Sequence, residues 1–220
     1  MALLPAVEIE PPVPATAAVI WLHGLGADGH DFEPVVPELG LPADAPIRFV
    51  FPHAPRIPVT INNGYVMPAW YDILEMDLGR RVDTGQLLAS ARAVQALVDR
   101  ERERGIASER IVLAGFSQGG AVVYQAALTY PEPLAGVLAL STYFATADTI
   151  RPDAANRKLL IRICHGLMDD VVPESLGQAA QKRLQEMGYA PEYLTYPIGH
   201  SVSLAEIRDL GMFLRAWLLP

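Results

Sequence analysis

The apolar residues of this 220-residue chain are concentrated in short runs, which polar, glycine-rich or proline-rich segments separate. Runs of this kind predict buried strands, because parallel strands that are covered on both faces lack a polar side. We expect six strands, at residues 16–22, 47–51, 111–114, 135–140, 159–164 and 193–196.

Apolar residues at helical spacing alternate with these runs. Asp83 and Thr84 are typical cap residues for a helix that continues until Gly105 ends it. Other helices are expected at residues 32–39, 121–128, 173–187 and 203–219. The alternation of strands and helices predicts an α/β fold with a mainly parallel central sheet flanked by helices.

The sequence GFSQG at residues 115–119 lies between the strand at 111–114 and the helix at 121–128. It fits the G-x-S-x-G pattern of a nucleophile elbow, a sharp turn that holds a serine at the top of the sheet. Gly115 and Gly119 suit this turn, because the backbones on either side of Ser117 must approach closely. We therefore expect Ser117 to be a nucleophile and not merely a helix cap.

A serine nucleophile needs a histidine to take its proton and a carboxylate to orient that histidine. In folds with this elbow the order along the chain is serine, acid, histidine, with the partners in loops after later strands. His200 follows the strand at 193–196 and is the only histidine after the acidic loop. Asp169 and Asp170 follow the strand at 159–164, and periodicity does not distinguish between them.

A glycine-rich loop follows the first strand. Residues 23–31 contain three glycines, which allow the backbone to turn its N–H groups inward, as a second oxyanion donor requires. An early loop of this kind supplies that donor in α/β-hydrolases. The glycines also suit an ordinary surface loop, and we expect His23 and His30 to be structural.

The segment at residues 52–72 is too long and too apolar for a simple connection. We expect Met67, Trp70 and Tyr71 within it to line a pocket for the acyl or alcohol part of a substrate. The alternative is that they anchor the segment on the core.

Composition and charge restrict the class of protein. Hydrophobic residues make up 51% of the chain and charged residues 19%, which argues for a single domain over residues 1–220 with a large core. The net charge of −8 argues against nucleic acid as a partner. The alternating charges at residues 100–104 are interpreted as a solvated helix end.

Other classes are excluded by what the sequence lacks. No apolar run approaches the roughly 20 residues that cross a bilayer, so we expect no stable membrane insertion. The segment at 1–15 has no features of a signal peptide, and the single Cys164 lies in an apolar strand, which together favour a cytoplasmic protein. The histidines form no metal-binding pattern, and we expect neither a metal nor another cofactor. The segment between the strands at 135–140 and 159–164 is too short for a lid domain.

Several longer motifs resemble the phospholipase/carboxylesterase family of α/β-hydrolases, which includes acyl-protein thioesterases and bacterial carboxylesterases. They are HGLGADGHDF from His23, FPHAPRIPVTINNGYVMPAWYDI from Phe51, GFSQGG from Gly115, HGLMDDVVP from His165 and GHS from Gly199.

This resemblance implies which residues act in the site. It implies that Asp169 is the acid that pairs with His200, and that the backbone N–H groups of Leu25 and Gln118 form an oxyanion hole. The resemblance leaves the substrate open, because members of the family act on esters, thioesters and lysophospholipids. Since the segment between the strands at 135–140 and 159–164 is too short for a lid domain, we expect a small, open site and a serine carboxylesterase that hydrolyses short- to medium-chain esters of small-molecule or acylated substrates. The alternatives are an acyl-protein thioesterase or lysophospholipase for longer chains, or a non-catalytic binding module. We expect a monomer or a homodimer.

Overall fold

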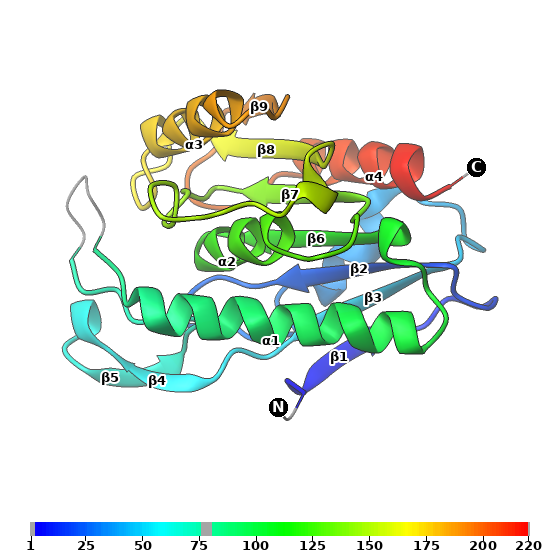
Figure 1. Ribbon diagram of the computed structural model, residues 1–220, viewed down its shortest axis with the longest axis horizontal. Helices are drawn as coiled ribbons and strands as arrows, with labels where there is room; N and C mark the ends of the chain where they lie inside the picture. The colour runs from blue at the N-terminus through cyan, green and yellow to red at the C-terminus, as the bar shows by residue number, and fades with distance from the viewer. Residues whose placement is uncertain (1–2, 76–80, 220) are drawn as a thin grey trace.

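Each of the six apolar runs forms a strand of one sheet in the computed structural model, which describes residues 3–75 and 81–219 (Figure 1). Neighbouring strands among these six are parallel, as the two-sided apolar pattern predicts. The strands are β2 (Ala17–Leu22), β3 (Ile47–Pro52), β6 (Ile111–Phe116), β7 (Gly136–Leu140), β8 (Leu160–Gly166) and β9 (Glu192–Tyr196).

A further strand at the edge of the sheet was not predicted. It is β1 (Ala6–Ile9), which pairs antiparallel with β3 and completes the order β1-β3-β2-β6-β7-β8-β9. All four of its residues are only partly buried, and prolines and glutamates surround it in the sequence. The apolar pattern of this segment is therefore too weak to distinguish a strand from a loop in the sequence.

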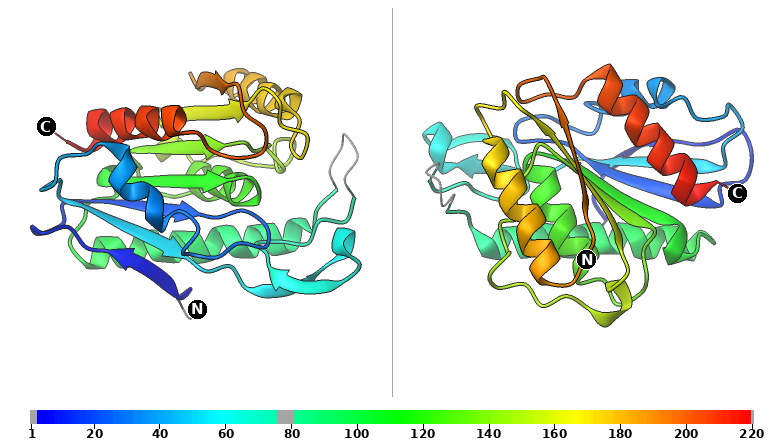
Figure 2. Two further views of the ribbon diagram at one scale, coloured as in Figure 1. Left: turned by 180° about the vertical axis from the view of Figure 1, so that it is seen from behind. Right: turned by 90° about the horizontal axis from the view of Figure 1, so that it is seen from above.

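The helices cover both faces of this sheet, as Figure 2 shows. Side chains of α1 (Thr84–Glu103), α2 (Gln118–Leu128) and α3 (Glu174–Glu186) pack on one face. The other face is covered by α4 (Leu204–Leu218) and by the short 3₁₀ helix Glu33–Leu39. Alternate residues of one strand enter the two cores: Ile20 and Leu22 face α1 and α2, whereas Val19 and Trp21 face the other layer.

The segment at 52–72 contains a β-hairpin where the sequence predicted a long loop. Strands β4 (Arg56–Val59) and β5 (Tyr65–Pro68) form a separate two-stranded antiparallel sheet beside the C-terminal ends of the central strands (Figure 1). Asn63 and Gly64 have positive φ angles of 55° and 74° in its turn. An Asn-Gly pair between extended segments is a hairpin signal. The prolines on either side argue against strands, and for that reason the hairpin was not predicted.

The prediction that the charged run at 100–104 is a solvated helix end is wrong. The side chain of Glu101 is fully buried and forms ion pairs with Arg48, Arg100 and Arg104, at 2.7, 2.9 and 3.1 Å. Glu8 and Glu10 of the N-terminal segment extend this network. The cluster connects the end of α1 to β1 and β3.

The connection between β7 and β8 is short. Within it the structure describes one regular element, the three-residue 3₁₀ helix Ala154–Asn156, so no lid domain is inserted here. None of the helices in residues 3–75 and 81–219 has the length and apolar character needed to cross a membrane.

Candidate active site

Ser117 is at the junction of β6 and α2, in a strained conformation with φ 52° and ψ −118°. A Cβ atom at Gly115 would be 2.5 Å from the backbone of Gly119, and one at Gly119 would be 2.6 Å from the carbonyl oxygen of His23. These distances explain why the turn requires glycine at both positions. The Ser117 N–H donates to the Leu140 carbonyl at 2.9 Å and fixes the elbow on the sheet.

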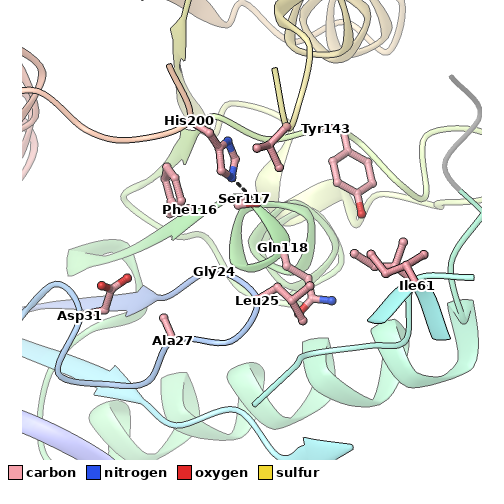
Figure 3. A pocket seen from close by; sticks show the side chains of 12 residues that line it. Gly24, Leu25, Ala27, Asp31, Ile61, Phe116, Ser117, Gln118, Tyr143 and His200 are labelled. Carbon is pink, nitrogen blue, oxygen red and sulfur yellow. Dashed lines mark hydrogen bonds between the residues drawn. The ribbon is translucent and has the colours of Figure 1, made fainter. Parts of the chain in front are cut away.

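Ser117, His200 and Asp169 form a continuous chain of hydrogen bonds. The Nδ1–H of His200 donates to Oδ2 of Asp169 at 2.7 Å, which leaves Nε2 to accept from the Ser117 hydroxyl at 3.0 Å (Figure 3). Asp169 is buried, whereas Asp170 is exposed. The structure thus selects Asp169 as the partner of His200, a choice that residue periodicity left open.

Backbone groups of its own loop hold Asp169 in place. Its Oδ1 accepts from the N–H groups of Val171 and Val172, at 3.0 and 2.7 Å. His165, at the end of β8, closes the same loop by donating from Nε2 to the Val172 carbonyl at 2.8 Å. Burial lowers the pKa of His165, so it donates as a neutral imidazole. Sequence reasoning gave His165 no role, although it begins the HGLMDDVVP motif.

The glycine-rich loop after β2 is fixed to the elbow by buried polar contacts. The indole Nε1 of Trp70 donates to the His23 carbonyl at 2.9 Å. The His23 ring donates from Nδ1 to the Gly24 carbonyl at 2.7 Å and accepts at Nε2 from the N–H of Ala54 at 3.2 Å. Burial lowers the pKa of His23, in agreement with this neutral, structural histidine.

The side chain of Gln118 ties the same region together from the other side. Its Oε1 accepts from the N–H of Trp70 at 2.8 Å, and its Nε2 donates to the Tyr71 carbonyl at 2.6 Å. Within the described residues, the backbone N–H groups of Leu25 and Gln118 have no hydrogen-bond partner. Both residues line the cavity at Ser117.

A cavity of about 240 Å³ opens beside Ser117. Figure 3 shows Ile61 and Tyr143 on one side of Ser117, and Phe116 and Asp31 on the other. The side of Ile61 and Tyr143 is largely apolar and suits a hydrocarbon chain. The residues that line the cavity are Gly24, Leu25, Ala27, Asp31, Ile61, Ile73, Phe116, Ser117, Gln118, Tyr143, Val171 and His200.

Met67, Trp70 and Tyr71 are not among these lining residues, contrary to the expectation from sequence. Trp70 and Tyr71 are fully buried behind the cavity, where their main chains bind Gln118. The Tyr71 hydroxyl is 2.7 Å from that of Tyr143, and Tyr143 itself lines the cavity. Trp70 and Tyr71 instead anchor the segment at 52–72 on the core, which was the alternative expectation. The sulfur of Met67 accepts from Asn62 at the hairpin.

The parallel sheet, the strained serine after its central strand and the histidine and aspartate after later strands define an α/β-hydrolase. The match to a family model is nearly complete: the phospholipase/carboxylesterase model covers residues 5–218. The chain therefore belongs to the phospholipase/carboxylesterase family.

Individual relatives agree with this membership. Acyl-protein thioesterase 1 of Gibberella zeae is 38% identical over 216 residues, which cover 93% of this chain and 92% of the relative. An Oryza sativa protein named as a probable carboxylesterase is 38% identical over 214 residues, or 93% of this chain and 80% of the relative. The crystal structure of Arabidopsis thaliana SOBER1 superposes with a TM-score of 0.86 at 32% identity, covering 92% and 99% of the two chains.

Proposed function

We propose that this chain is a serine carboxylesterase that hydrolyses short- to medium-chain carboxylic esters through an acyl-enzyme. One observation carries the proposal: the hydrogen-bonded chain from Ser117 through His200 to Asp169 opens into a largely apolar cavity. A neutral histidine whose Nδ1–H is held by a carboxylate can accept the serine proton at Nε2.

In the proposed mechanism, the Ser117 hydroxyl oxygen attacks the acyl carbonyl carbon while Nε2 of His200 takes its proton. The carbonyl oxygen becomes an oxyanion that the N–H groups of Leu25 and Gln118 stabilise. His200 then gives the proton to the leaving oxygen or sulfur, and the alcohol or thiol departs. Water repeats these steps on the acyl-enzyme and releases the acid and Ser117.

A second candidate, hydrolysis of thioesters with longer acyl chains, is favoured by the Gibberella zeae relative, which is named an acyl-protein thioesterase. The same residues would serve both reactions, because the leaving atom alone differs between an ester and a thioester. The volume of about 240 Å³ beside Ser117 supports the shorter chains. The buried, free Cys164 is in keeping with a reducing, cytoplasmic location.

The experiment that tests this proposal is hydrolysis of p-nitrophenyl esters and matching acyl thioesters of increasing chain length. We expect kcat/KM to be highest for short to medium esters. Ser117→Ala should reduce kcat by a factor on the order of 10⁶, because the covalent route is lost. A mutant that keeps a tenth of the activity would exclude Ser117 as the nucleophile, and a clear preference for long thioesters would favour the second candidate.

A further inference from the structure

A second hollow adjoins the cavity at Ser117. It has a volume of about 420 Å³ and shares Asp31, Phe116 and His200 with the first cavity. Outside these shared residues it is lined by the 3₁₀ helix Glu33–Leu39, the residue before it and the segment after His200. We call this hollow the outer groove.

The position of the outer groove fits the part of the substrate that leaves. In the proposed function, Nε2 of His200 must deliver its proton to the departing oxygen or sulfur, so the leaving group has to lie against His200. The outer groove touches His200 but neither Ser117, Leu25 nor Gln118, which belong to the acyl and oxyanion side. Figure 3 places Asp31 and Phe116 on the opposite side of Ser117 from Ile61 and Tyr143.

Rigid aromatic side chains support this groove. The ring of Phe116 packs against the ring of His200, with centroids 4.7 Å apart, and against Phe32 at 5.8 Å. Phe32 in turn stacks on Trp21 of β2 at 4.9 Å. Aromatic rings attract organic cations, and a surface fixed by packing can bind one without prior rearrangement.

The charge of the outer groove is negative. Asp31 and Glu38 line it and are exposed, and no lysine or arginine is among the lining residues. Within the described part of the chain, neither carboxylate has an ion-pair partner. Two uncompensated carboxylates beside aromatic rings favour a cation and oppose an anion.

We infer that the outer groove binds the leaving group of the substrate, and that Asp31 and Glu38 select leaving groups with a positive charge, such as an ammonium-bearing alcohol or thiol. This inference rests on the proposed esterase function. It concerns the alcohol or thiol side, whereas the apolar cavity at Ile61 and Tyr143 concerns the acyl side.

The test compares two esters of one acid. One is butyrylcholine, and the other is its uncharged isostere, in which a tert-butyl group replaces the trimethylammonium group. We expect kcat/KM to be higher for butyrylcholine. Asp31→Asn and Glu38→Gln should each lower the ratio of the two kcat/KM values by about two- to five-fold, the range of exposed charge pairs. Raising the ionic strength to about 1 M should lower it as well.

Glu103→Gln is the matched control, because Glu103 is an exposed glutamate at the end of α1. It makes the same change in net charge and should leave the ratio at its wild-type value. A substitution that lowers the hydrolysis of both esters equally leaves the ratio unchanged. Glu38→Lys should reverse the preference, so that the uncharged ester becomes the better substrate.

Three outcomes decide the inference. A lowered ratio in Asp31→Asn and Glu38→Gln, but not in Glu103→Gln, supports it. A wild-type ratio near one, or equal effects of all three substitutions, overturns it while the esterase function stands. If the wild-type protein hydrolyses neither ester nor any of the p-nitrophenyl esters, the proposed function itself fails and the inference fails with it.

Discussion

The indole nitrogen of Trp70 donates a hydrogen bond to the carbonyl oxygen of His23, at 2.9 Å, and thereby joins the segment after the hairpin to the loop that contains Leu25. Both residues are buried. The same carbonyl is in close contact with Gly119 of the elbow. Trp70 therefore helps to set the distance between the two backbone N–H groups that we propose as oxyanion donors.

Trp70→Phe should reduce kcat by about ten- to a hundred-fold with a smaller effect on KM. Phenylalanine fills most of the space but leaves the buried His23 carbonyl without its donor, so the loop can shift, and small displacements at a reacting centre are costly. Steady-state kinetics on one ester measures both constants. Trp217→Phe, in α4, is the control for loss of an indole. A raised KM with unchanged kcat would contradict a positioning role.

Asp169→Asn should reduce kcat by a factor on the order of 10⁴, whereas Asp170→Asn should change it by less than about two-fold. Asparagine can still accept from the N–H groups of Val171 and Val172, so the loop should remain folded. However, its amide cannot hold the Nδ1–H of His200 as a carboxylate does. Kinetics of the two single mutants with the same ester makes this comparison. Equal losses in both would argue against the assignment.

The positions of Ser117, Asp169 and His200 could be predicted from sequence, because they depend on a short local motif and on the order of residues along the chain. The elbow at Ser117 is a five-residue pattern, and the ends of parallel strands meet at one edge of the sheet, which brings His200 and Asp169 close to it. The direction of individual side chains could not be predicted. From sequence, Trp70 and Tyr71 look the same whether they line a pocket or lie behind it. Their position behind the cavity depends on the hydrogen bonds between their main chain and the side chain of Gln118, which the sequence does not reveal.

Charge patterns were misleading for a similar reason. Glu101 and Glu103 are alternate acidic residues in one charged run, yet one is fully buried and the other exposed. The difference arises from Arg48 in β3, which is 53 positions away from Glu101 in the sequence. A contact between residues so far apart leaves no trace in helical periodicity.

Glu101→Gln should lower the free energy of unfolding by roughly 1–3 kcal/mol. Breaking one partner of a buried ion pair costs more than this, but the arginines of the cluster reach solvent and can be partly hydrated. Urea unfolding curves give the change. Glu103→Gln, two residues away, should stay within about 0.5 kcal/mol of wild type. If the two mutants unfold at the same urea concentration, the cluster does not contribute to stability.

We expect Glu206, in the first turn of α4, to make the stability of the fold depend on pH. Its side chain is fully buried, and neither carboxyl oxygen has a hydrogen-bond partner among the described residues. Burial raises its pKa to about 8, and the nearby Asp209 adds to the increase. In the folded protein this carboxyl is therefore neutral at pH values where it is ionised in the unfolded chain.

Glu206 then holds more protons in the folded state than in the unfolded state between pH about 4.5 and 8, so its contribution to stability falls as pH rises through this window. The contribution of Glu206 is complete below the unfolded pKa and lost above the folded one, with a slope of at most about 1.4 kcal/mol per pH unit. Glu206→Gln removes this titration and should therefore remove the fall in stability that Glu206 contributes across this window.

Urea unfolding of wild type and Glu206→Gln at pH 6, 7, 8 and 9 measures the slope. We expect the mutant to gain stability relative to wild type at each step up to about pH 8, with no further gain above it. Glu103→Gln, which changes an exposed carboxylate, should keep the wild-type slope. Parallel profiles for wild type and Glu206→Gln would mean that Glu206 is already ionised in the folded protein, with solvent or a bound cation reaching its carboxylate.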